Sequence, residues 1–291
     1  MRQKMSWGLG LLALLLLVAP AIGLAQEKAP APKAVAPAPP AASQPAPAAK
    51  ETTPAPDAKQ ILQKMCDFLK NQQQFSFKAE VTDDQVYAGG RKLQYGLDVE
   101  AFFRRPDKLR INGDGDVESK QLFFDGKTLT LYDKDKNHYG SLEIPGDIDA
   151  ALDKAGKEYG VRVGLAELGA NRLAAHASQG VTNALYVGES KVRGVTCQHL
   201  AFDKEKVHYQ LWIDTGDKPL LRKVVVTQKK LSGGPQWTAY FSDWNFAPQL
   251  ADSLFTFSPP PGAQKIKFMP VKKAAPPAPK PAKSKKKGGA S

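Results

Sequence analysis

The chain has few of the residues on which enzymes and metalloproteins depend, with two cysteines and four histidines among 291 residues. It contains no G-x-S-x-G, H-E-x-x-H or C-x-x-C motif and no glycine-rich phosphate loop. Carboxylates are numerous but scattered over expected strand faces and turns, where solvation accounts for them, and spacing alone nominates no acid–base pair. The sequence therefore predicts a noncatalytic protein with no catalytic residues, no metal and no cofactor.

Long hydrophobic runs are also missing, apart from one near the amino terminus. The run Leu9–Val18 follows Arg2 and Lys4, is shorter than the roughly 20 residues of a spanning helix, and is followed by Pro20. This pattern favours a cleavable signal peptide over residues 1–25 rather than the rival reading, a membrane anchor. No cysteine follows the run, so a lipid-anchored amino terminus is not indicated. We expect export to the periplasm and no integral membrane segment in the mature chain.

The folded part lacks an excess of charge, although the formal net charge is +12. Residues 1–56 hold five basic and two acidic residues, and residues 270–291 hold seven lysines and no acid, which leaves 29 basic and 27 acidic residues between them. A phosphate-binding face needs concentrated basic charge, so nucleic-acid binding is not expected. Residues 26–56 are rich in Ala and Pro and predict a disordered linker; residues 270–291 predict a disordered basic tail, which either is simply solvated or contacts an anionic envelope surface.

Between residues 57 and 269, apolar and polar residues alternate in several stretches. In the stretch 91–111 every second residue from Leu93 to Phe103 is apolar, which is the period of a strand with one buried face. Arg105 and Pro106 interrupt this run, and Leu109 and Ile111 resume it, so we expect two strands joined at a tight corner.

Further elements follow the same reasoning. Asp57 caps an expected helix that ends near Asn71, and a strand from Phe75 pairs with the 91–111 stretch through a Gly89–Gly90 turn. More antiparallel strands are expected at 122–124, 128–132, 139–144, 184–187, 195–202, 207–213, 220–227 and 237–246. Between them, one helix is expected after Asp147 and a second, short helix through Leu165, Leu168 and Leu173. These helices need an apolar surface to cover, and the concave face of the sheet is the obvious one.

A four-residue loop at 203–206 would place Phe202 opposite Val207. One face of that hairpin would then hold Leu200, Phe202, Val207, Tyr209 and Leu211, and the other Cys197, His199, His208, Gln210 and Trp212. A thiol and two imidazoles suit zinc, but a structural zinc site needs four ligands, so a partly buried polar cluster is favoured.

The two cysteines, Cys66 and Cys197, leave two alternatives open. In an exported protein they can form a disulfide between the first helix and the hairpin, or they can remain two small buried side chains. The sequence does not show whether the pair can approach to bonding distance.

Several segments carry a resemblance to a known family. VEAFFRRPDKLRI, FFDGKTLTLYDKDKNHY and FTFSPPPGA resemble motifs of periplasmic lipoprotein carriers and receptors of the LolA and LolB type. Together with GVTCQHLAF and HYQLWID, they are more similar still to periplasmic proteins of the domain of unknown function family 2092. The resemblance implies an α+β fold: a strongly curved antiparallel sheet, an open half-barrel, whose concave face is covered by helices above an apolar cavity.

We therefore expect a protein that binds a lipophilic ligand, an acyl chain or the lipid of a lipoprotein, between sheet and helices. The expected lining consists of Tyr95, Leu97, Val99, Phe103, Leu109, Tyr209 and Leu211. Each of these also suits an ordinary core position. The alternative is a structural or adaptor protein of the cell envelope, whose domain binds another protein.

Overall fold

The structure is a computed structural model that describes residues 56–271. The predicted signal peptide (1–25), the predicted linker up to residue 55 and the predicted tail from residue 272 lie outside the described residues.

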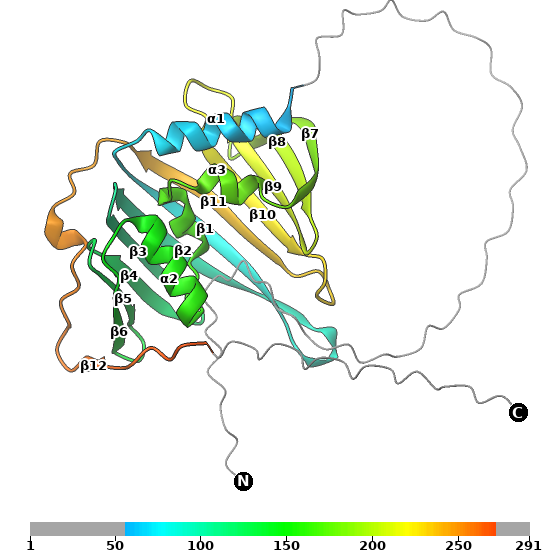
Figure 1. Ribbon diagram of the computed structural model, residues 1–291. Helices are drawn as coiled ribbons and strands as arrows, with labels where there is room; N and C mark the ends of the chain where they lie inside the picture. Colours follow the sequence, from blue (N-terminus) through cyan, green and yellow to red (C-terminus); the bar gives the residue numbers. More distant parts are fainter. Residues whose placement is uncertain (1–55, 272–291) are drawn as a thin grey trace, which may run out of the picture.

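One sheet of twelve strands organises the described chain (Figure 1), in the order β12-β6-β5-β4-β3-β2-β1-β11-β10-β9-β8-β7. The strands are β1 (Gln74–Val86), β2 (Lys92–Arg104), β3 (Lys108–Gly115), β4 (Ser119–Phe124), β5 (Thr128–Asp133), β6 (His138–Glu143), β7 (Val181–Val192), β8 (Val195–Lys204), β9 (Val207–Asp214), β10 (Leu221–Gln228), β11 (Gln236–Asn245) and β12 (Gln264–Lys265). Neighbours in this part of the chain run antiparallel except β12 and β6. Strands β12 and β7 do not pair with each other, so the sheet is open, as predicted. The sequence did not predict β12, which has two residues, and predicted a shorter β7.

Strands β1, β2 and β3 follow the predicted alternation. Phe103 is opposite both Phe75 of β1 and Leu109 of β3, and the side chains of all three are fully buried. The chain turns between β2 and β3 at Arg105 and Pro106, which confirms the tight corner. The concave face of this three-stranded centre therefore forms an aromatic and aliphatic core.

Helices cover the concave face, as predicted (Figure 1). Helix α1 (Ala58–Lys70) begins after Asp57, whose carboxylate accepts a hydrogen bond from the Lys59 amide at 2.8 Å. Helix α2 (Ile148–Tyr159) begins after Asp147 in the same way and ends at Gly160, whose φ of 70° suits a glycine. Both predicted caps are confirmed.

The predicted helix through Leu165, Leu168 and Leu173 is wrong, because two short pieces occupy this stretch: the 3₁₀ helix η2 (Gly164–Gly169) and helix α3 (Leu173–Ser178). Two contacts break the helix. The backbone of Gly169 lies so close to Phe103 that a Cβ atom at position 169 would be 2.1 Å from the ring. The Asp149 carboxylate then accepts hydrogen bonds from the Asn171 and Arg172 amides at 2.9 and 3.2 Å.

The hairpin of β8 and β9 has the predicted faces but not the predicted register. Phe202 lies opposite Tyr209 rather than Val207, and the turn is correspondingly shorter. A shift of two residues returns every side chain to the same face, so the face assignment holds. On the outer face His199 Nε2 lies 2.9 Å from Gln210 Oε1 and its ring stacks on Trp212, which confirms a partly buried polar cluster.

The disulfide alternative is wrong, because both cysteines are free thiols. Cys66 belongs to the concave core and lies near Tyr209, whose pKa is raised first by burial and then by this thiol. Cys197 lies three residues from Leu200, which faces that core, so alternation directs it to the opposite face. The sheet therefore separates the two sulfur atoms.

Arg105 joins the helices to the sheet at the β2–β3 corner. Its Nε donates to the Gln72 carbonyl at 3.1 Å, and its two Nη atoms donate to the carbonyls of Leu69 and Gly169 and, at 3.0 Å, to Asn171 Oδ1. One guanidinium thus satisfies acceptors at the end of α1 and between η2 and α3.

We predict that Arg105→Ala lowers the free energy of unfolding by about 2–3 kcal/mol, because several part-buried acceptors lose their donor. Urea unfolding followed by circular dichroism measures this loss. Arg193→Ala is the control: Arg193 pairs with Glu80 at 2.6 Å on the surface, so its loss costs less than about 1 kcal/mol. Equal losses for the two variants would contradict the assigned role of Arg105.

We also predict that neither thiol of the native protein reacts with a thiol reagent at neutral pH. Burial raises the pKa of Cys66 to about 12 and raises that of Cys197, so little reactive thiolate forms. Both thiols should react after denaturation without reductant. If the mass of the native protein were lower by two hydrogen atoms and no thiol reacted after denaturation, the cysteines would form a disulfide and the prediction would be wrong.

Candidate functional site

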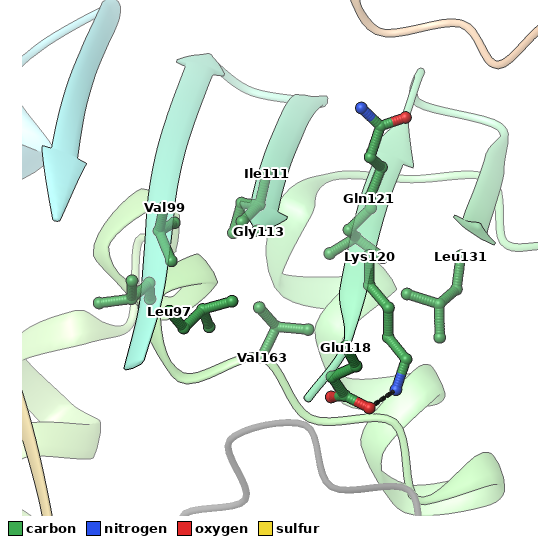
Figure 2. Close-up of a pocket in the computed structure, with 11 residues that line it drawn as sticks. Leu97, Val99, Ile111, Gly113, Glu118, Lys120, Gln121, Leu131 and Val163 are labelled. Atoms are coloured by element: carbon green, nitrogen blue, oxygen red, sulfur yellow. Dashed lines mark hydrogen bonds and ion pairs between the residues drawn. The ribbon is translucent and has the colours of Figure 1, made fainter. Parts of the chain in front are cut away.

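A small apolar cavity lies between the concave face of the sheet and the chain that joins α2 to η2 (Figure 2). Its volume is about 50 Å³. The residues around it come from β2 to β5, from the β3–β4 turn and from residues 163–165: Leu97, Val99, Ile111, Gly113, Glu118, Lys120, Gln121, Leu122, Leu131, Val163 and Leu165. Most of this lining is aliphatic, so the site offers dispersion contacts and exclusion of water to an apolar group.

Two glycines of β3 make room for the cavity floor. Val99 lies opposite Gly113 and Leu97 lies opposite Gly115. A Cβ on Gly113 would be 3.2 Å from Leu97 Cδ1, and one on Gly115 would be 2.9 Å from it. Larger residues there would push Leu97 out of place. Glycine at alternate strand positions is the sequence signal that points to this floor.

The roof of the cavity consists of Val163 and Leu165, which are 8% and 4% exposed. Gly160 ends α2, the Val161 amide bonds back to Ala155, and the Ala166 amide bonds to Val163. Within the described chain no hydrogen bond joins residues 161–165 to the sheet. Apolar contact alone therefore holds the roof on the floor.

A charged pair borders one end of the cavity. Lys120 Nζ forms an ion pair with Glu118, as the dashed line in Figure 2 shows, and the Lys120 side chain is only 10% exposed. A lysine buried to this degree needs such a partner. The site therefore combines an apolar interior with one polar margin.

The seven predicted ligand contacts do not lie together. Leu97 and Val99 line the cavity. Phe103, Leu109 and Leu211 are buried in the core.

The two predicted tyrosines also lie away from the cavity. Tyr209 donates its hydroxyl to the Ala177 carbonyl at 2.7 Å, beneath α3. Tyr95 lies on the projecting part of β2, where its hydroxyl is 2.8 Å from that of Tyr87. The roof residues were missed because alternation identifies a strand face but not which part of it a loop covers.

The two histidines considered for a zinc site, His199 and His208, contact other side chains instead. His208 Nδ1 pairs with Asp203, and His199 is engaged by Gln210 and Trp212. Within residues 56–271 no group of three or more His, Cys, Asp or Glu side chains is arranged to hold a metal ion. No helix in this range is both long and apolar enough to span a bilayer.

Solved structures with a similar chain path include an uncharacterized conserved protein from Thermus thermophilus (TM-score 0.44, 11% identity, covering 72% of this chain and 98% of that one). They also include the lipoprotein LppX from Mycobacterium tuberculosis (TM-score 0.41, 16% identity, covering 67% of this chain and 98% of that one) and a LolA superfamily protein from Nitrosomonas europaea (TM-score 0.32, 13% identity, covering 70% of this chain and 99% of that one). A search of curated proteins found no match.

The sequence itself matches one family over residues 58–269, which is nearly the whole described range. That range contains the corner at Arg105 and the floor and roof of the cavity. The chain belongs to the family described as predicted periplasmic protein, DUF2092.

Proposed function

We propose that this chain is an exported noncatalytic protein that binds a lipophilic ligand, an acyl chain or the lipid of a lipoprotein, between the sheet and the helices. The observation that carries the proposal is the aliphatic cavity beneath a roof that apolar contact alone attaches to the sheet. The description of the family as periplasmic supports the location, and the predicted signal peptide supplies the route.

The cavity has to widen to accept such a ligand. Its volume of about 50 Å³ is far below the roughly 300–1,000 Å³ of ordinary ligand sites. Lifting Val163 and Leu165 breaks no hydrogen bond to the sheet. A bound chain would replace the apolar contacts that the lifted roof gives up, so opening costs less with the ligand than in water.

We predict that Leu97→Trp weakens ligand binding, because the larger ring occupies the space above Gly113 and Gly115. The mature protein is purified from the periplasm, extracted with organic solvent and analysed by mass spectrometry. A fluorescent fatty acid is then titrated into the extracted protein, where we expect at least about a tenfold loss of affinity.

Leu185→Trp is the control, since Leu185 lies on β7, is 54% exposed and is outside the cavity. It should bind as the unaltered chain does. An unaltered protein that carries no lipid and ignores fatty acids and lipopeptides would overturn the proposal.

One observation favours the alternative, an envelope adaptor that binds another protein. Strand β7 is an uncovered edge of twelve residues on which Leu185 and Val187 are 54% and 49% exposed. Such an edge can receive a strand from a partner. In that case the basic tail at 270–291 would contribute contact with an anionic envelope surface, and the cavity would stay empty.

A further inference from the structure

Two turns lie side by side at one end of the sheet. Strand β1 pairs with β11, so the β1–β2 turn and the β10–β11 turn are neighbours. The Gln236 amide donates to the Asp84 carboxylate at 3.0 Å, and a Cβ on Gly233 would be 3.8 Å from Val86 Cγ2. Figure 1 shows the β1–β2 hairpin extending past the helices. We call residues 86–93 and 229–235 the hairpin tips.

The hairpin tips expose large apolar side chains. Val86 is 38% exposed, Tyr87 45%, Leu93 41% and Leu231 50%. Scattered single exposures are ordinary, but a group on two touching turns marks a surface that meets something apolar.

The charges on the hairpin tips are of one sign. Arg91, Lys92, Lys229 and Lys230 are basic, and the tips contain no acidic residue. Lys92 pairs with Asp84 at 3.0 Å, and Lys229 donates to the Lys204 carbonyl at the end of β8 and pairs with Asp203 at 3.9 Å. Among the residues described, Arg91 and Lys230 form no ion pair. One uncommitted cation therefore stands close to Leu93 and the other beside Leu231.

The apolar surface of the tips continues toward the cavity. Leu93, Tyr95, Leu97 and Val99 occupy alternate positions of β2 and so share its concave side. Leu97 and Val99 line the cavity, and Leu93 lies roughly 14 Å from Leu97 along the strand.

We propose that the hairpin tips dock on the surface of an anionic lipid bilayer. Leu231, Leu93 and Val86 enter the boundary between headgroups and acyl chains, while Arg91 and Lys230 remain at the level of the phosphates. Docking of this kind brings to the bilayer the end of β2 from which the apolar side leads to the cavity. The inference deepens the proposed function, since it names the source and acceptor of the ligand, but docking can be measured on empty protein.

A bilayer suits this surface better than a protein does. The exposed side chains project from two narrow turns, which can pass between headgroups. A stable protein interface buries about 800 Å² on each side, which needs a broader surface, and it usually meets charges of both signs.

The test places a reporter in the full mature chain with Leu231→Trp. Vesicles contain phosphatidylcholine alone or mixed with phosphatidylglycerol, with bromine atoms on the acyl chains. We expect the added fluorescence at position 231 to shift to the blue and to be quenched by the mixed vesicles, and not by phosphatidylcholine alone. Leu185→Trp, on the equally exposed edge strand β7, should show no quenching.

A second pair of variants separates docking from attraction by the basic tail. Arg91→Glu with Lys230→Glu should weaken binding to the mixed vesicles at least about tenfold. Lys64→Glu with Lys70→Glu, on the exposed side of α1, changes the net charge equally and should have little effect.

Equal weakening by both pairs, or an unquenched reporter at position 231, overturns the proposal. A reporter that ignores vesicles and is instead shielded by an envelope protein overturns it in favour of a protein partner. Quenching at position 231 in a chain that carries no lipid supports docking while the carrier function fails, so the two failures are distinguishable.

Discussion

The structure depends on covering the concave face of an open sheet. A sheet that does not close leaves one continuous apolar side, and that side must be buried by other parts of the same chain. The protein does this with helices inserted before β1 and between β6 and β7, and it holds them with the Arg105 guanidinium at the β2–β3 corner. Polar contacts fix the cover at that corner, while apolar contacts alone hold it over residues 161–165.

This uneven cover creates a gradient along β2. Phe103 is fully buried next to the anchored corner, and Val99 is 5% exposed at the cavity. Leu97 is half-buried at the cavity floor, and Leu93 is exposed to solvent on the hairpin beyond the helices. A single alternating strand thus passes from core to cavity to exposed tip, and the proposed binding and docking surfaces are successive parts of one face.

The convex face is covered differently, by the chain after β11. Phe257 packs on Phe123 and Tyr139 with ring centroids 5.3 and 5.0 Å apart, and the same segment then pairs with β6 as β12. The segment therefore covers part of the convex face of β4–β6, on the side of the sheet opposite the cavity. The sequence segment FTFSPPPGA resembled a family motif. Of its two aromatic residues, Phe257 packs against β4 and β6, and Phe255 lies under the Arg104 guanidinium of β2.

The sequence by itself determined the local elements: the capped helices after Asp57 and Asp147, the strand alternation and the faces of the β8–β9 hairpin. These follow from side-chain period and capping, which act over a few residues. Only the tertiary structure decided which apolar positions became core and which line a cavity, because Leu97 and Phe103 share one strand face and differ solely in what lies above them. It also separated Cys66 from Cys197, because Cys66 lies in the core on the concave side of the sheet and Cys197 lies on the opposite side.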